Sequence, residues 1–492
     1  MSICTVSLWF IVATLTVLGI NSKFGVNGTL VVWGTRSSHI VRKGMLMIRH
    51  ITVDGFKTLD EFKMELRPGL NILVGPNGSG KTNIISFFEF LGFLQHMKVA
   101  DAISSAGGAG SIFRKIGEKL YIATISSEIT GIARLGYKRY IYYQYSFVIS
   151  LRESGESIVY SQQKLKLTFR TVDSAKRLSR NYDLYIELHT DDGFKPKAKI
   201  LNFSEKLLAL LNSRRVNKRQ KSSIEEMKTR LRHVLENSDP DETIISSTRF
   251  IDRTVYWALY NDIKGGQTYN IEPSKAKIAD DSAKKAGVSK DGSGLYSTLY
   301  ALQKFERLPH RNKFFMFPLD EIDYGKDASL AKILKYAQLA NEWISNIDVV
   351  NNPFDKQLQI RVSVSGKDET TILPLSAMSD GTVKWIALIT IILTNPTMFS
   401  IEEPENYLHP LMLSEIISIM RTYTKKERLI LMSTHSETLL NSATPDEIIV
   451  VSYKDGKTTA KRVSNADELT KEIRNTGFGL GYYYMSGSFD HE

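Results

Sequence analysis

Residues 70–82 read LNILVGPNGSGKT, and this stretch decides the fold. The apolar run 70–74 predicts a buried strand, and GPNGSGKT matches the phosphate-binding pattern GxxxxGK[ST]. Apolar residues then recur at helical spacing at Ile84, Ile85, Phe88 and Leu91. A strand followed by this loop and a helix aims backbone N–H groups at phosphate oxygens. We therefore expect a nucleotide to bind at Gly75, Asn77, Gly78, Ser79, Gly80, Lys81 and Thr82.

The residue types of this loop have separate tasks. Its glycines keep the backbone accessible, because side chains there would block the approach of phosphate. Lys81 is expected to reach the β- and γ-phosphates of ATP, and Thr82 to give its hydroxyl to Mg²⁺. The alternative is a glycine-rich turn that happens to contain Lys-Thr, which leaves the preceding strand and the following helix unexplained.

Two acidic residues end a predicted strand towards the other end of the chain. The mostly apolar run 398–401 is followed by Glu402 and Glu403. At such a strand end one carboxylate suits a metal ion, and its neighbour suits a water as general base. An acidic pair alone is more often a solvated turn, but the next apolar strand, 429–433, leads to His435. We predict Glu402 as a metal ligand, and Glu403 and His435 as catalytic residues.

A predicted helix start lies before the acidic pair. Residues 379–382 read SDGT and lead into the apolar run 385–393. Ser379 and Gly381 at this position predict an N-cap with free N–H groups, which suits a phosphate. An ordinary helix cap is the alternative.

The pieces GPNGSGKT, SDGT, IEEPENYLHP and STHS, in this order, resemble the ABC-type heads of the structural-maintenance, RecF and double-strand-break-repair group. They are more similar to the AAA-domain ATPases of overcoming-lysogenization-defect (OLD) proteins and of anti-phage systems such as Septu. Glu402 departs from the Asp that most ABC heads carry. The resemblance implies that Lys81 and Thr82 belong to Walker A, Ser379 and Gly381 to the signature loop, Glu402 and Glu403 to Walker B with its catalytic glutamate, and His435 to the switch.

This resemblance implies an α/β fold, namely an ABC-type P-loop head with a mixed sheet, flanking helices and an antiparallel β subdomain. It also implies ATP and Mg²⁺ as cofactors and a head-to-head dimer or higher oligomer, because the signature loop of one subunit caps ATP held by another.

The same resemblance implies an ATPase that gates a separate effector, an HNH-type nuclease, in bacterial anti-phage defence. The residues after His435 are too few for the Toprim nuclease of OLD proteins, so we expect no nuclease domain in the chain itself. Two alternatives stay open. One is a RecF-like DNA-repair clamp, and the other is a scaffold that sequesters a toxin until it is triggered.

An insertion is predicted between the motifs. About 300 residues separate Thr82 from Ser379, too few for a long antiparallel coiled coil. Strand-like runs at 121–129, 140–151, 165–169 and 182–189 predict the antiparallel subdomain. The expected domains are an N-terminal part of the head at 46–200, a mostly helical insertion at 201–310 and a C-terminal part of the head at 311–492.

The predicted insertion carries a basic cluster without interleaved aromatic residues. Such a cluster either contacts a nucleic-acid backbone or forms a solvated helix face, and the second interpretation is favoured. Its members are Arg214, Arg215, Lys218, Arg219 and Lys221.

Composition and charge restrict the remaining classes. With 42% hydrophobic and 24% charged residues, the chain has the composition of globular proteins rather than of disordered or multi-spanning ones. A formal net charge of +11 favours anionic partners such as nucleic acid, or simply describes a basic protein. The single cysteine, Cys4, excludes an intrachain disulfide and favours a reducing, cytoplasmic location.

Residues 1–45 are expected to form an apolar N-terminal extension. The run 3–20 has no charged residue and is close to the shortest length that spans a bilayer. No basic residue precedes it, as a secretory signal would require. A misassigned start upstream of Met45 or Met47 is favoured over a single membrane anchor or an ordinary helix, so we expect no membrane association.

Overall fold

The structure is a computed structural model in two compact units. Residues Met1–Arg42 and Val172–Leu178 form the first unit, and Lys43–Thr171 and Ser179–Glu492 form the second. The structure describes residues 23–24, 30–31, 47–116, 120–136, 139–151, 157–171, 182–191, 194–203, 207, 224–263, 266–307, 329–352, 356–366, 369–395, 398–424 and 428–487. In the first unit these are the antiparallel strands β1 (Lys23–Phe24) and β2 (Leu30–Val31). The predictions for the run 3–20 and for the basic cluster at 214–221 lie outside the described residues.

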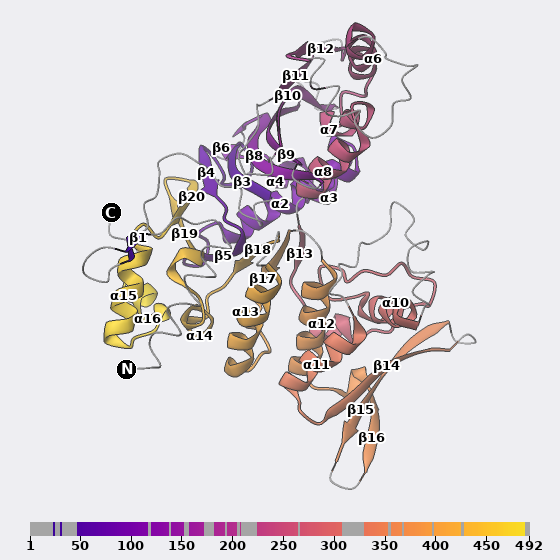
Figure 1. The fold of residues 1–492 in the computed structure, drawn as a ribbon, viewed down its shortest axis with the longest axis vertical. Coiled ribbons are helices and arrows are strands. Elements are labelled where there is room, and N and C mark those ends of the chain that lie inside the picture. Colours follow the sequence, from indigo (N-terminus) through magenta and orange to yellow (C-terminus); the bar gives the residue numbers. More distant parts are fainter. Residues whose placement is uncertain are drawn as a thin grey trace. The chain divides into compact units, whose positions relative to one another are not determined.

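A six-stranded sheet organises the second unit (Figure 1). Its strand order is β13-β17-β18-β5-β19-β20, and every neighbouring pair is parallel except β19 and β20. The strands are β5 (Gly69–Val74), β13 (Gln267–Tyr269), β17 (Phe399–Glu402), β18 (Leu429–Ser433), β19 (Ile448–Lys454) and β20 (Lys457–Arg462).

Both faces of this sheet are buried, which explains why its strands are apolar runs rather than alternating ones. Leu73 and Leu431 belong to a core shared with α2 (Lys81–His96). The neighbouring residues Ile72 on β5 and Met432 on β18 face the opposite side. They belong to a second core, which includes α13 (Pro410–Thr424). The predicted strands at 70–74 and 429–433 and the helix after the phosphate-binding loop are confirmed.

A seven-stranded antiparallel sheet packs with α2 in the first core. Its order is β12-β11-β10-β9-β8-β3-β4, and the four predicted strand runs correspond to β8, β9, β10 and β11. The strands are β3 (Met47–Asp54), β4 (Phe62–Glu65), β8 (Thr124–Gly136), β9 (Arg139–Leu151), β10 (Ile158–Thr171), β11 (Tyr182–Thr190) and β12 (Pro196–Leu201). Its accompanying elements are α3 (Val99–Ser105), α4 (Ala109–Ile112), β6 (Lys115–Ile116), β7 (Leu120–Tyr121), α6 (Ile224–Glu236), α7 (Ile244–Ser247), η1 (Thr248–Phe250) and α8 (Arg253–Ile263).

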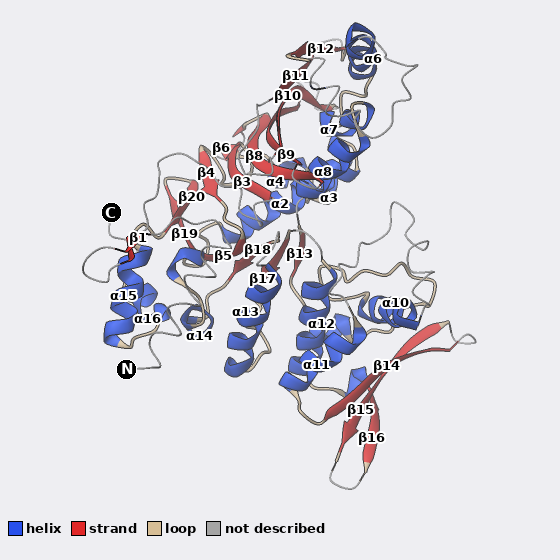
Figure 2. Ribbon diagram, viewed as in Figure 1, coloured by secondary structure: helices blue, strands red, loops and turns tan. Residues whose placement is uncertain are grey.

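A third layer joins the second core. The three-stranded antiparallel sheet of β14 (Ile344–Asn352), β15 (Gln357–Ser365) and β16 (Thr370–Pro374) lies beside α10 and α11, and α12 contributes to the same core (Figure 2). These helices are α10 (Leu295–Arg307), α11 (Leu330–Ala340) and α12 (Asp380–Thr394), and α9 (Pro273–Ala276) packs on α12. The remaining elements are η2 (Leu375–Ala377), α14 (Glu437–Asn441), η3 (Pro445–Glu447), α15 (Ala466–Thr476) and α16 (Leu480–Met485).

The predicted insertion at 201–310 needs one correction. It is mostly helical in its described residues, but it also contains β13, which pairs with β17 at the edge of the central sheet. Gly266 permits this close approach, because a side chain there would overlap the backbone of Phe399. The segment is therefore part of the head rather than wholly an insertion into it.

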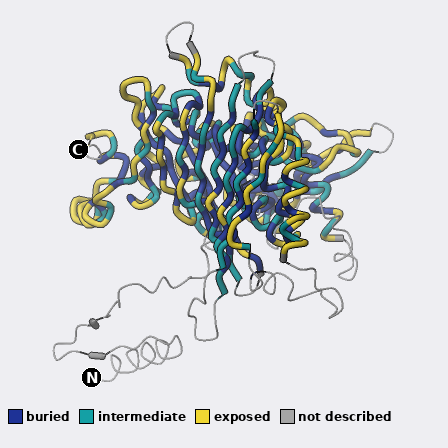
Figure 3. Tube along the Cα trace, turned by 90° about the horizontal axis from the view of Figure 1, so that it is seen from above, coloured by how far each residue is buried: buried dark blue, intermediate teal, exposed yellow. Residues whose placement is uncertain are grey.

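Figure 3 shows the buried residues gathered in the middle of the second unit and the exposed ones around it. The fold class expected from the sequence, an α/β P-loop head with a mixed sheet and an antiparallel β subdomain, is confirmed. Within the described residues, no helix has both the length and the apolar composition that crossing a bilayer requires.

Candidate nucleotide-binding site

The phosphate-binding loop connects β5 to α2, and the start of α2 is left open. Gly80 caps the helix in the left-handed conformation, with φ 103°, and no side chain accepts a hydrogen bond from the first turn. The first turn also contains no acidic residue. By contrast, Ser329, Ser379 and Ser436 cap α11, α12 and α14 with their side chains. An uncapped helix N-terminus carries free N–H groups and partial positive charge, which is the environment a phosphate prefers.

Close packing fixes this loop. A side chain at Gly80 would overlap Thr458, which is fully buried on β20. The Thr458 hydroxyl lies 2.6 Å from that of Thr58, and the Asn83 amide donates to Thr58 at 2.7 Å. The loop is thus held between the β3–β4 connection and the β19–β20 hairpin.

Lys81 lies against the loop that precedes it. Its ammonium donates to the carbonyl oxygens of Gly75 at 2.8 Å and Pro76 at 3.0 Å. Burial lowers the pKa of Lys81, and the nearby Glu403 carboxylate opposes that effect. The side chain therefore already lies within the loop, with its charge near the acidic pair.

The acidic pair lies at the same sheet edge as the loop. Glu402 pairs with Ser433, which pairs with Leu73, so the carboxyl ends of β17, β18 and β5 are aligned. Burial raises the pKa of Glu402, and the nearby Thr82 hydroxyl opposes that effect. The structure thus places the predicted Walker A threonine close to the predicted metal-side acid.

Glu403 adopts an uncommon backbone conformation. Its φ of 43° lies in the left-handed region, which non-glycine residues adopt at a cost of about 1–2 kcal/mol. Its N–H donates to the carbonyl of Ser433 at 3.0 Å, and the Asn406 amide donates to its carboxylate at 3.1 Å. Such strain clusters at functional sites.

His435 follows β18 and is exposed. Its backbone N–H donates to Oε1 of Glu405 at 2.9 Å, and the Thr434 hydroxyl donates to the same oxygen at 2.7 Å. Glu405 therefore links the loop that carries Glu403 to the end of the strand that carries His435.

The predicted signature loop is placed beside the loop after β17. Ser379 accepts a hydrogen bond from the N–H of Thr382 at 3.2 Å, as an N-cap does. A side chain at Gly381 would press on the carbonyl oxygen of Tyr407. Asp380 pairs with Lys277 at 2.6 Å. These contacts join the signature loop to Tyr407 in the loop after β17 and to Lys277, the residue that follows α9.

Residues 70–441 match the family model described as "AAA domain, putative AbiEii toxin, Type IV TA system". The chain belongs to this AAA-domain family.

Two relatives of the AAA-domain chain match over short segments. It is 35% identical over 103 residues to the chromosome partition protein Smc of Desulfitobacterium hafniense (strain Y51), which covers 20% of the chain and 8% of Smc. It is 36% identical over 52 residues to the DNA replication and repair protein RecF of Corynebacterium jeikeium (strain K411), which covers 11% of the chain and 12% of RecF. The match thus spans only a small part of each relative's length.

Solved structures with a similar arrangement include the SmcHead bound to the C-winged helix domain of ScpA, with a TM-score of 0.44 and 13% identity over 86% of this chain and 99% of that chain. The SMC head domain from Thermotoga maritima aligns with a TM-score of 0.34 and 11% identity, over 85% of this chain and all of that chain.

The donor set of the AAA-domain chain fits a magnesium ion bound together with a nucleotide. Thr82 and Glu402 offer one hydroxyl and one carboxylate close to each other. Among the described residues no group of three His, Cys, Asp or Glu side chains is arranged to hold a metal alone. Mg²⁺ is commonly bound by one or two protein oxygens, with substrate phosphates and water completing the octahedron.

Sequence reasoning missed three residues at this site. Thr458 braces the phosphate-binding loop, Glu405 holds the backbone of His435, and Lys384 donates to the carbonyl of Glu403 at 3.3 Å. Glu405 stands in the quoted stretch IEEPENYLHP, so its acidic character was visible. Nothing in the sequence pairs it with β18, and nothing marks Lys384 or Thr458.

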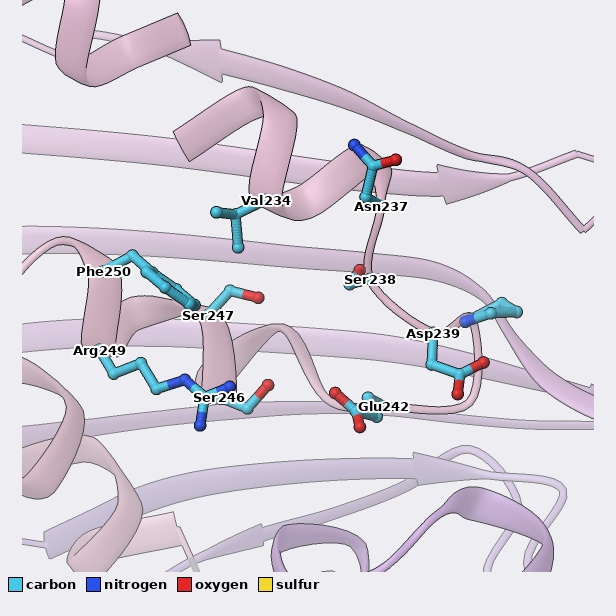
Figure 4. A pocket seen from close by; sticks show the side chains of 10 residues that line it. Val234, Asn237, Ser238, Asp239, Glu242, Ser246, Ser247, Arg249 and Phe250 are labelled. Atoms are coloured by element: carbon cyan, nitrogen blue, oxygen red, sulfur yellow. The ribbon is translucent and has the colours of Figure 1, made fainter. Parts of the chain in front are cut away.

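A separate pocket of about 470 Å³ lies by the seven-stranded sheet (Figure 4). It is polar, and Asp239 in its wall already pairs with Lys98. It includes none of the predicted site residues. Its lining residues are Val234, Asn237, Ser238, Asp239, Pro240, Glu242, Ser246, Ser247, Arg249 and Phe250.

Proposed function

We propose that this AAA-domain protein binds and hydrolyses ATP at the loop 75–82. The γ-phosphate lies at the start of α2, where Lys81 and the backbone N–H groups of the first turn stabilise its charge. Thr82 and Glu402 would hold Mg²⁺, which would supply positive charge to stabilise the phosphates in the transition state. The observation that carries the proposal is the uncapped start of α2 beside an acidic pair at the same sheet edge.

In the chemical step a water oxygen attacks the γ-phosphorus, and the bond from that phosphorus to the β–γ bridging oxygen breaks. Glu403 accepts a proton from the attacking water, and the bond electrons remain on ADP. Its carboxylate is oriented by the Asn406 amide at 3.1 Å. His435, at the end of the adjacent strand, is proposed to contact the γ-phosphate or the water.

Two copies are proposed to bind head to head, with Ser379 and Gly381 of one covering ATP on the other. Ser379 and Asp380 are exposed at the start of α12, where N–H groups gather. Tyr407, whose carbonyl lies against Gly381, is 62% exposed, and Leu411, in the first turn of α13, is 74% exposed. Large exposed apolar side chains next to a polar loop suit a contact surface between subunits.

The hydrolytic cycle is proposed to gate a separate effector, an HNH-type nuclease, in a cytoplasmic anti-phage system of the Septu kind. The motif resemblance supports this, and the family description, which names a toxin of a toxin–antitoxin system, is in keeping with a defence role. The same description favours a second candidate, a scaffold that holds a toxin until it is triggered. The short similarity to Smc and RecF favours a third, a DNA-repair clamp, for which the basic cluster at 214–221 is a candidate contact.

An affinity purification tests which partner this ATPase has. Glu403→Gln is the bait, because it removes the base while leaving the phosphate contacts and so is expected to retain ATP and the closed dimer. Lys81→Ala, which should not bind nucleotide, is the control. We expect a small nuclease to be retained by Glu403→Gln and lost from Lys81→Ala. Recovery of a toxin without nuclease domain, or of DNA with repair proteins alone, would contradict this proposal and support the second or the third candidate.

A further inference from the structure

Lys384 is a buried charge in an otherwise apolar helix. Its side chain is 1% exposed, one turn into α12, and every residue from Val383 to Thr394 is buried. Burying an ammonium costs several kcal/mol unless polar or charged groups surround it, as for any ion moved from water into protein. An apolar residue at this position would pack without the cost of desolvating an ammonium. The presence of a lysine therefore indicates a role other than packing.

The loop after β17 supplies the partners of this lysine. The Lys384 ammonium donates to the carbonyl oxygen of Glu403 at 3.3 Å and lies 5.6 Å from the centre of the Tyr407 ring. Burial lowers its pKa to about 8, while the Glu405 and Glu403 carboxylates act in the opposite direction. The lysine thus faces the loop that carries the proposed base, where two carboxylates favour its charged form.

Glu405 continues the connection from Lys384 to β18. Its Oε1 accepts hydrogen bonds from the Thr434 hydroxyl and the His435 N–H, while its Oε2 is buried without a hydrogen-bond partner. Nearby positive charge is what makes such a buried carboxylate oxygen tolerable. The positive charge of Lys384 on α12 therefore attracts Glu405, and Glu405 holds the end of β18 through its hydrogen bonds to Thr434 and His435.

The backbone at Glu403 needs such support. A non-glycine residue at φ 43° persists only where the surroundings fix it. Lys384 holds the carbonyl of this residue, and Ser433 holds its N–H. The two bonds come from different elements, α12 and β18.

We propose that Lys384 and Glu405 are positioning residues, which hold Glu403 and His435 in the geometry for hydrolysis and tie that geometry to the helix behind the signature loop. This proposal rests on the proposed role of Glu403 as the base. Because α12 begins at the signature loop, a second copy that contacts Ser379 shifts the same helix that fixes the base in the first copy. Closure of the dimer is thereby coupled to the chemical step in each subunit.

The test compares the single-turnover hydrolysis rate with ATP affinity in the full chain. Lys384→Met keeps the length of the side chain but removes its charge and donors. Misplacement of a catalytic group by a fraction of an ångström to 1 Å costs up to about 100-fold, so we expect the rate to fall at least about tenfold with the dissociation constant for ATP within about threefold. Lys335→Met, which removes an exposed lysine from the adjacent helix α11, should change neither.

Glu405→Gln gives an independent variant if Lys384→Met fails to fold, because Gln still accepts from Thr434 and His435 but lacks the charge. We expect a similar loss of rate, and a double variant no slower than the worse single one, since the two residues act together.

A rate equal to the wild type in both variants overturns the inference. Equal loss of rate, ATP affinity and thermal stability also overturns it, because that pattern indicates a structural role. Glu403→Gln distinguishes the proposed base from the proposed positioning role. If this variant retains the wild-type rate, the assignment of Glu403 as the base is wrong. If it is inactive while Lys384→Met and Glu405→Gln are fully active, only the positioning role is wrong.

Discussion

Gly78 and Gly80 show how much of this site depends on single positions. Both have positive φ, 78° and 103°, yet a side chain at Gly78 would meet nothing within 4 Å, whereas one at Gly80 would overlap Thr458. Replacement by alanine costs about 1 kcal/mol at either position for the left-handed backbone, and overpacking adds about 1–3 kcal/mol at Gly80 alone. We therefore expect Gly80→Ala to lower the free energy of unfolding clearly more than Gly78→Ala.

Urea unfolding of both variants without nucleotide measures this difference. Thr458→Ala in the Gly80→Ala background should recover part of the loss, because it removes the hydroxyl and methyl group that the new side chain meets. Equal destabilisation by the two glycine substitutions would contradict the packing described for the loop.

The residues found by sequence and those missed differ in a physical way. Lys81 and Thr82 belong to the phosphate-binding loop, and Glu402 to the acidic end of a strand. In both patterns the chemistry fixes the residue types and their spacing, so these residues could be predicted from the sequence. Lys384 and Glu405 matter through contacts between α12, the loop after β17 and β18, which no local pattern reports. A lysine next to a helix start would ordinarily be expected in solvent.

At the scale of elements, long apolar strands were predictable and short ones were not. β5 and β18 are buried on both faces and read as apolar runs. β13 has only three residues, Gln267–Tyr269, and its place is fixed by pairing with β17, far away in the sequence. The predicted insertion at 201–310 therefore missed a strand of the central sheet.

The contact between α8 and β9 predicts a pH dependence of stability. The Tyr143 hydroxyl donates to the partly buried Asp262 carboxylate at 2.5 Å, and burial raises the pKa of Asp262 to about 7, against the effects of this hydrogen bond and of Arg49. In the unfolded chain this pKa is about 3.9, so between these values the folded state binds the proton more tightly. The contribution of Asp262 to stability is then complete below pH 4 and falls as the pH rises towards 7.

Asp262→Asn removes this titration while keeping an acceptor for Tyr143. Between pH 5 and pH 7 we expect the wild type to lose about 2 kcal/mol of unfolding free energy relative to the variant. Tyr143→Phe should steepen the wild-type dependence, because the hydrogen bond it removes lowers the pKa of Asp262. Parallel pH profiles of the wild type and Asp262→Asn would show that the pKa of Asp262 is not raised in the folded protein.

At the scale of the whole molecule, two chains build each site in the proposed mechanism. The structure brings Lys81, Thr82, Glu402 and Glu403 together in one chain. In the signature loop, Ser379 lies exposed at the start of α12 and Gly381 lies against the Tyr407 carbonyl. In the proposed dimer each site consists of the phosphate-binding loop of one chain and the signature loop of the other. Lys81→Ala therefore disables the phosphate-binding loop, and Ser379→Arg disables the signature loop. Each variant alone should be inactive, since each dimer then lacks one half in both sites.

Steady-state ATP hydrolysis by an equal mixture of Lys81→Ala and Ser379→Arg shows whether two chains share each site. A mixed dimer has one site with an intact loop from the Ser379→Arg chain and an intact signature from the Lys81→Ala chain. With random pairing, about half of the dimers are mixed, and each of these has one intact site out of two. We therefore expect about a quarter of the wild-type rate, although each preparation alone is inactive. No recovery in the mixture, with mixed dimers shown to form, or full activity of Ser379→Arg alone, would contradict the shared site.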